Sequence, residues 1–222
     1  MIHNELDLKA IIFDMDGVLI NTEPQYENFW RLSAKKYNVY FEGFEKKIRG
    51  MTVKRLFQEQ FINIGDVEKE NLLKEFKAFE DEMLFPEIPG VSALLSGLKE
   101  SKIKLALVTS SDLVKLSRVN GQRNYNLYFD VMITADDVVE GKPSPECYLK
   151  AAEELGVDPK TCIVFEDSFA GISAAKSAEM VVVGISSSHS EIELISECKN
   201  VISDFQYINL QDIVSFFESE NQ

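Results

Sequence analysis

Short apolar runs rich in β-branched residues, separated by helical patterns, constrain the fold of this chain more than any other feature. The runs lie at residues 10–13, 103–108, 131–134, 163–165 and 181–185, and from the second run onward a helical pattern separates each from the next. Such alternation is typical of a parallel sheet whose two faces are covered by helices. The sequence therefore predicts an α/β fold with a doubly wound, Rossmann-like parallel-sheet core.

One long interval interrupts this alternation. Between Pro24 and Pro89 there are helical patterns but no convincing strand, and the segment 85–90 that ends the interval carries prolines and a glycine. Aromatic residues recur at helical spacing along 24–38, which indicates a hydrophobic core more than a ligand site. We expect a small helical cap domain, residues 23–90, inserted after the first strand of a catalytic core made of residues 1–22 and 91–222.

The first apolar run leads directly into Asp14-Met15-Asp16-Gly17. Side chains alternate along a strand, so Asp14 and Asp16 project to one side at its carboxyl end, where open α/β sheets bind ligands. Neighbouring carboxylates repel each other and one pKa rises. Two carboxylates are kept this close when they bind a metal, share a proton, or act one as an acid and the other as a base. An ordinary turn after a strand is the structural alternative.

Polar groups also follow other predicted strands. Thr109 and Ser110 end the second run and offer hydroxyl and N–H groups to an oxyanion. Lys142 lies in a loop before a helix and supplies a positive charge. Glu166 and Asp167 end the fourth run and offer hard oxygen ligands. We expect all of these groups at one edge of the sheet.

Each of these groups has an ordinary structural explanation when it is taken alone. The hydroxyls of Thr109 and Ser110 are suited to capping the next helix. Lys142 is compatible with a solvated loop, and acidic residues such as Glu166 and Asp167 are favoured where a helix begins. Their common order and their placement at strand ends favour a functional site.

The combination of motifs resembles the haloacid dehalogenase-like superfamily of phosphotransferases, in the branch with a small helical cap. The motifs read FDMDGVLINTEP, VTSS, GKPSPECY and FEDSFAGISAA, and the resemblance covers nearly the whole chain. Within that branch the sequence looks most like the β-phosphoglucomutase-like and sugar-phosphate phosphatase group. The resemblance implies a Mg²⁺-dependent phosphatase of small phosphorylated metabolites, with sugar phosphates as the expected class.

The resemblance also implies roles for the four acids. Asp14 would be the nucleophile that becomes an aspartyl phosphate, and Asp16 would be the general acid and base. Asp14, the main-chain carbonyl of Asp16, Glu166 and Asp167 would hold Mg²⁺. The acids would thus supply the nucleophile, the proton carrier and the metal site.

The remaining implied contacts concern the phosphoryl and leaving groups. Thr109 and Ser110 would hold phosphoryl oxygens, and Lys142 would neutralise the nucleophile and the transferring group. In the cap, Glu23 and Arg49 are our predictions for contacts with the leaving group.

Two other functions stay open as alternatives. In the mutase of this group, the helix after the first motif carries a histidine near the active site, and spacing from Asp14 places Tyr26 there. The histidines of this chain, His3 and His189, lie outside the four motifs. We therefore favour a phosphatase over a β-phosphoglucomutase-type phosphotransferase. A non-catalytic phosphate- or Mg²⁺-binding regulatory domain is the second alternative.

Charge and composition restrict the partners and the compartment. The net charge of −14 argues against a nucleic-acid or anionic-membrane partner, since both would be repelled. The three cysteines are widely spaced and form no C-x-x-C, which suggests neither disulfides nor a zinc site. With no apolar run of membrane-spanning length and no signal peptide, we expect a cytoplasmic protein, and a monomer by default.

Overall fold

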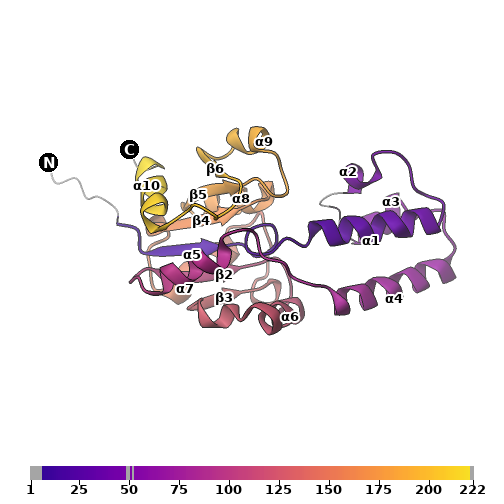
Figure 1. Cartoon of the computed structure of the whole chain (residues 1–222), viewed down its shortest axis with the longest axis horizontal. Helices are drawn as coiled ribbons and strands as arrows, with labels where there is room; N and C mark the ends of the chain where they lie inside the picture. Colours follow the sequence, from indigo (N-terminus) through magenta and orange to yellow (C-terminus); the bar gives the residue numbers. More distant parts are fainter. Residues whose placement is uncertain (1–6, 49–50, 52, 221–222) are drawn as a thin grey trace. The chain divides into compact units, whose positions relative to one another are not determined.

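The computed structural model describes residues 7–48, 51 and 53–220, and its core is a parallel sheet. Six strands lie side by side in the order β3-β2-β1-β4-β5-β6 (Figure 1). All five neighbouring pairs are parallel, which confirms the predicted α/β, doubly wound core. The strands are β1 (Ala10–Phe13), β2 (Lys104–Val108), β3 (Val131–Ile133), β4 (Cys162–Glu166), β5 (Val181–Ile185) and β6 (Asn200–Ile202).

The predicted strands agree with the observed ones to within one residue at each end, and one strand was missed. The missed strand is β6, whose three residues Asn200–Ile202 are too short to show an alternating pattern and are only half-buried. It pairs with β5 at the edge of the sheet. Its formation therefore depends on the neighbouring strand more than on its own sequence.

Helices follow the strands of the core and cover the sheet. They are α5 (Val91–Lys99), α6 (Leu113–Arg123), α7 (Glu146–Leu155), α8 (Phe169–Ser177), α9 (Glu191–Ile195) and α10 (Leu210–Glu220), with short 3₁₀ turns η1 (Tyr125–Leu127), η2 (Ala135–Asp137) and η3 (Pro159–Thr161). Ala10 and Ile12 of β1 pack with α7 and α8 in one hydrophobic cluster. On the other face Phe13 stacks on Phe165 with ring centroids 5.2 Å apart. Both faces of the sheet are thus buried, as the continuous apolar runs predict.

The interval that lacks strands forms a compact unit of its own, Thr22–Leu84. Its helices are α1 (Glu23–Lys36), α2 (Phe44–Ile48), α3 (Val53–Glu59) and α4 (Asp66–Glu82). Trp30 of α1 stacks on Phe76 of α4 with ring centroids 4.9 Å apart, and Phe29 stacks on Phe79 at 4.7 Å. The aromatic stripe is therefore the core of the helical unit, as its spacing predicts.

The bounds of this unit differ from the predicted 23–90. The segment after Leu84 belongs to the core unit. Ile20 and Glu87 form an antiparallel bridge, and the N–H of Ile88 donates to the carbonyl of Leu19 at 3.0 Å. Phe85 is buried at 2% exposure. Backbone pairing of residues distant in sequence thus draws the return segment into the core, and helix-breaking residues alone do not reveal that pairing.

No helix in the described part of the chain combines the length and the apolar character that crossing a membrane requires.

Gly90 caps the return segment at a position where only glycine fits. Its φ is +88°, and a Cβ atom there would lie 2.2 Å from the carbonyl carbon of Phe205. Gly90→Ala should lower the free energy of unfolding by about 1–3 kcal/mol, because it adds both left-handed strain and a backbone clash. Urea unfolding followed by circular dichroism measures this loss.

Gly97 provides the matched control within α5. A Cβ atom there meets nothing within 4 Å, so Gly97→Ala should raise the free energy of unfolding by about 0.5–1 kcal/mol. Equal stabilities for the two variants would contradict the assigned clash.

Candidate active site

The sheet order brings the predicted site residues to one edge. Asp14 directly follows β1, Thr109 directly follows β2, and Glu166 is the last residue of β4. Because β1 lies between β2 and β4 and all three run parallel, their carboxyl ends meet. Lys142 arrives from the loop between η2 and α7. These side chains thus converge at the edge where open α/β sheets bind ligands.

Lys142 is the charge around which the site is arranged. Its ammonium lies 2.6 Å from Oδ1 of Asp14 and 2.6 Å from Oε1 of Glu166, and its side chain is only 5% exposed. It also lies 4.9 Å from the ring centroid of Tyr148. Burial alone would lower the pKa of Lys142, but the carboxylates of Asp14 and Glu166 outweigh this and hold the pKa well above its usual value. Lys142 is therefore a permanent cation in this site.

Both carboxylate oxygens of Glu166 are occupied by protein donors. Oε1 accepts from Lys142 and from the hydroxyl of Tyr148 at 3.0 Å. Oε2 accepts the N–H groups of Asp167 and Ser168 at 2.8 and 2.9 Å. Burial would raise its pKa, but Lys142 and these hydrogen bonds lower it below the usual value. Glu166 is thus a buried anion with its acceptor positions filled, which argues against the direct metal contact predicted for it.

Gly171 of α8 makes room for this carboxylate. A Cβ atom at Gly171 would lie 1.7 Å from Oε1 of Glu166. The helix therefore approaches Glu166 more closely than any other residue type would allow. Gly171 and Tyr148 both lie within the quoted motifs, but residue type and spacing alone did not indicate these roles.

Asp14 and Asp167, by contrast, each keep one oxygen without a protein donor among the described residues. Oδ1 of Asp14 accepts from Lys142, and Oδ2 of Asp167 accepts from Ser187 and Ser188. Their second oxygens receive no hydrogen bond from the described part of the chain. The structure therefore presents two carboxylate oxygens at this edge that a ligand can occupy.

The electrostatics of these two acids reflect an excess of negative charge. Burial raises the pKa of Asp14 well above its usual value, and the charges of Glu166 and Asp167 add to this against the lowering by Lys142. Burial and the charge of Glu166 raise the pKa of Asp167 to about 7. Three carboxylates thus share one lysine. A divalent cation would offset the remaining charge, and oxygen ligands of this kind suit Mg²⁺.

Within the described residues, no group of three or more histidine, cysteine or acidic side chains is arranged to hold a metal ion. Asp14 and Asp167 are the acids of this edge with a second oxygen that receives no hydrogen bond from the described residues, so these two are our candidates to hold a metal. The main-chain carbonyl of Asp16, two residues beyond Asp14, is the further oxygen that the sequence predicts.

The carboxylate of Asp16 is anchored by Ser111, the last residue of the VTSS motif, and by Lys115, which lies outside the four motifs. Ser111 donates its hydroxyl to Oδ2 at 3.0 Å, and the ammonium of Lys115 lies 2.8 Å from both carboxylate oxygens. Asp16 is half-buried, in contrast to the buried Asp14. Lys115 reaches this position because Asp112 caps α6 and so places Lys115 in the first turn of the helix, next to the strand end.

Thr109 and Ser110 do not cap the helix that follows them. Asp112 fills that role by accepting the N–H of Lys115 at 2.8 Å, so the capping explanation for the two hydroxyls is wrong. Thr109 is buried, and its hydroxyl oxygen accepts the N–H of Ser111 at 3.0 Å. Ser110 is exposed at the sheet edge. Both residues therefore remain predictions for phosphoryl contacts.

The two residues that we predict to contact the leaving group, Glu23 and Arg49, belong to the predicted cap. Glu23 is the first residue of α1 in the helical unit and stays a prediction for a leaving-group contact. Arg49 lies outside the described residues. Tyr26, the position of the mutase histidine by spacing, donates its hydroxyl to Glu80 at 3.3 Å inside the helical unit.

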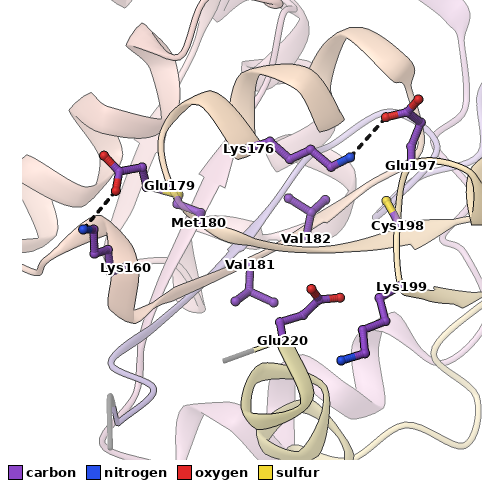
Figure 2. A pocket seen from close by; sticks show the side chains of 10 residues that line it. All are labelled: Lys160, Lys176, Glu179, Met180, Val181, Val182, Glu197, Cys198, Lys199 and Glu220. Atoms are coloured by element: carbon purple, nitrogen blue, oxygen red, sulfur yellow. Dashed lines mark hydrogen bonds and ion pairs between the residues drawn. The ribbon is translucent and has the colours of Figure 1, made fainter. Parts of the chain in front are cut away.

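A cavity of about 310 Å³ lies at the opposite, amino-terminal edge of the sheet (Figure 2). Lys160 pairs with Glu179 at 3.0 Å, and Lys176 pairs with Glu197 at 3.1 Å. Glu179, two residues before β5, adopts a φ of +60°, the left-handed region that favours glycine. Two of the three lysines in this cavity are thus already neutralised, so it resembles a phosphate site less than the carboxyl edge does.

The chain is similar to known proteins of one hydrolase family. The model of a family described as haloacid dehalogenase-like hydrolase matches residues 8–179. A phosphorylated carbohydrates phosphatase from Thermotoga maritima is 39% identical over 183 residues, which cover 77% of this chain and 82% of that protein. A β-phosphoglucomutase from Bacillus subtilis is 31% identical over 196 residues, covering 80% of this chain and 83% of the mutase. The crystal structure of a family IA, variant 3 hydrolase from Entamoeba histolytica matches with a TM-score of 0.80 at 29% identity, covering 95% of this chain and 99% of that one.

Replacing Lys142 by an apolar residue tests its place at the centre of the site. Lys142→Met leaves the buried carboxylates without their counter-ion, which should lower the free energy of unfolding by about 3–5 kcal/mol in EDTA at pH 8. Without the lysine, the folded-state pKa of Asp14 rises further above its unfolded value, and the pKa of Glu166 is no longer lowered by Lys142 and rises with burial. The free-energy cost of burying these carboxylates without a counter-ion is absent when they are protonated at low pH and grows as they ionise. The loss of unfolding free energy caused by Lys142→Met should therefore be smaller at pH 5 than at pH 8.

Lys176→Met is the matched control, because both partners of the Lys176–Glu197 pair are 46% exposed. The loss of unfolding free energy in Lys176→Met should stay below about 1 kcal/mol and change little between pH 5 and pH 8. Urea denaturation curves at both pH values compare the two variants. Similar losses for both lysines would show that Lys142 is not the buried counter-ion assigned here.

Proposed function

This chain belongs to the haloacid dehalogenase-like hydrolase family as a phosphatase, and we propose that it hydrolyses small phosphorylated sugars, with Mg²⁺, through an aspartyl-phosphate intermediate. The observation that most strongly supports this is the state of Asp14. One of its oxygens is held 2.6 Å from the ammonium of Lys142, while the other receives no hydrogen bond from the described residues. An oriented carboxylate with one free oxygen at the ligand-binding edge is suited to nucleophilic attack.

In the first half of the reaction, Oδ2 of Asp14 forms a bond to phosphorus as the bond between phosphorus and the ester oxygen breaks. Asp16 donates a proton to the departing alcohol. Lys142 holds the attacking carboxylate and stabilises negative charge on the transferring group, which is the main requirement of phosphoryl transfer. Thr109 and Ser110 hold phosphoryl oxygens. The products of this half are the free sugar and an acyl phosphate on Asp14.

In the second half, the ionised Asp16 takes a proton from water, whose oxygen attacks phosphorus. The bond to Asp14 breaks, inorganic phosphate leaves, and both aspartates return to their starting states. Ser111 and Lys115 hold the carboxylate of Asp16 at the edge of the site between these two proton transfers. The cycle consumes one water molecule and releases one phosphate.

The carboxylates of Asp14 and Asp167 and the carbonyl of Asp16 would hold Mg²⁺, Asp14 through Oδ1, so that its Oδ2 stays available for attack on phosphorus. When bound, the cation would neutralise these acids and draw charge from the phosphoryl oxygens. Glu166 has an indirect role: it forms an ion pair that holds Lys142 in place, and its oxygens accept hydrogen bonds from protein donors. Binding of Mg²⁺ also accounts for the clustering of acids whose pKa values are raised by burial and by one another.

The substrate class rests on the relatives. The similar Thermotoga maritima protein carries a name that specifies phosphorylated carbohydrates. The similarity to the Bacillus subtilis mutase keeps a second candidate function, phosphoryl transfer within β-glucose 1-phosphate, in consideration. The hydroxyl of Tyr26 donates to Glu80 at the position where the mutase carries its histidine, and this favours hydrolysis.

Asp14→Asn tests the nucleophile directly. Removing the anionic oxygen should lower Mg²⁺-dependent release of p-nitrophenol from p-nitrophenyl phosphate by roughly 10⁴-fold or more. Asp66→Asn is the control, since the side chain of Asp66 is fully exposed in the helical unit, and it should keep wild-type turnover. EDTA should abolish wild-type turnover and added Mg²⁺ should restore it. A wild-type protein without turnover, or an Asp14→Asn variant with substantial turnover, would contradict the proposal.

The choice between hydrolysis and mutase chemistry needs a substrate that permits both. We expect β-glucose 1-phosphate, given with a trace of glucose 1,6-bisphosphate and Mg²⁺, to yield glucose and inorganic phosphate. Coupled assays for glucose, phosphate and glucose 6-phosphate distinguish the outcomes. Accumulation of glucose 6-phosphate in place of free phosphate would assign the mutase function instead.

A further inference from the structure

The loop that follows β5 reaches the candidate active site from a part of the chain outside the recognised motifs. It reads Ser186-Ser187-Ser188-His189-Ser190 and leaves the carboxyl end of β5, the strand next to β4. From sequence, it looks like a solvated polar loop. In the structure its residues contact the turn after β1, the carboxylate of Asp167 and the start of α8.

Ser188 and Ser187 surround one oxygen of Asp167. The hydroxyl of Ser188 donates a hydrogen bond to Oδ2 of Asp167. The hydroxyl of Ser187 lies 3.3 Å from the same oxygen but 2.6 Å from the carbonyl oxygen of Gly17. A hydroxyl has one proton to donate, so Ser187 serves mainly Gly17, and Ser188 is the principal donor to Asp167.

Gly17 closes the other side of this carboxylate. A Cβ atom at Gly17 would lie 1.9 Å from Oδ2 of Asp167 and 3.0 Å from the hydroxyl oxygen of Ser187. Oδ2 of Asp167 is thus enclosed between the backbone of Gly17 and the hydroxyl of Ser188. With Oδ2 fixed, the orientation of the carboxylate is set, and Oδ1 is the oxygen left without a donor among the described residues.

The loop itself is anchored at both of its ends. The N–H of Ser186 donates to the carbonyl of Ile202 in β6 at 2.9 Å, and Ser190 forms a capping box with Glu193 at the start of α9. Between these two ends, the ring of His189 packs against the ring of Phe169, the first residue of α8, with ring centroids 4.3 Å apart. Ser188 is therefore presented to Asp167 by a loop with defined contacts on either side.

We propose that Ser188 is a positioning residue for Mg²⁺, which fixes one oxygen of Asp167 so that the other is presented to the cation. This inference rests on the proposed function, in which Asp167 is a metal ligand. Hydrogen-bond partners of metal-binding side chains typically change metal affinity by about 10–100-fold when they are removed. Ser188 lies outside the four motifs, so on this proposal a residue outside the motifs sets the affinity for Mg²⁺.

Isothermal titration of Mg²⁺ into the metal-free protein tests this assignment without relying on activity. Ser188→Val and Ser188→Thr have the same shape and differ in the hydroxyl, so they separate the hydrogen bond from packing. We expect Ser188→Val to raise the Kd for Mg²⁺ about 10–100-fold and Ser188→Thr to stay near wild type. Ser186→Ala is the control from the same loop, because within the described residues the hydroxyl of Ser186 donates to the carbonyl of Ile202, at 3.4 Å, and not to Asp167.

Activity gives a second readout. The Mg²⁺ concentration for half-maximal phosphatase activity should rise in Ser188→Val, while kcat at saturating Mg²⁺ stays close to wild type. Equal Mg²⁺ affinities of the Val and Thr variants would overturn the role of Ser188. A wild-type protein that binds no Mg²⁺ would overturn the metal dependence itself, which is a different result from the same titration.

Discussion

The ammonium of Lys142, lying 2.6 Å from both Asp14 and Glu166, is the interaction on which the rest of the site depends. Parallel strands bring acids from the ends of β1 and β4 to one buried edge, where they repel one another. A buried cation between two of these acids offsets their mutual repulsion and part of the cost of burying their charge. Through Glu166 the same cation is linked to Tyr148 in α7 and to the backbone at the start of α8.

The structure gives the acids of this edge different roles by supplying them with different numbers of donors. Glu166 receives donors on both oxygens and is held as a structural anion. Among the described residues, Asp14 and Asp167 receive donors on one oxygen each, and their second oxygens are the ones that we propose for a ligand. Asp16 sits apart in an ion pair with Lys115. These differences in hydrogen bonding are the basis of the different roles that we propose for the four acids.

Much of the fold could be predicted because its signals are local. Each strand of the core except β6 is a continuous apolar run, and the helical unit shows its aromatic stripe at helical spacing. The end of the helical unit was predicted too late in the chain, since the bridge between Ile20 and Glu87 joins residues far apart in sequence. Among the site residues, Glu166 was assigned to the metal because its residue type and position suit one. Its donors come from Lys142, Tyr148 and the backbone, and the motif does not reveal them.

The sequence by itself determined the alternation of strands and helices, the order of the four motifs and the placement of acids and hydroxyls at strand ends. These properties follow from periodicity and residue type, which a linear sequence records. Only the tertiary structure decided which carboxylate oxygens receive donors from the described part of the chain, that Lys115 pairs with Asp16, and that Ser188 holds Asp167. Hydrogen bonds and ion pairs between segments separated by tens of residues depend on how the strands are ordered in space, and the chain reaches that order only when its core is packed.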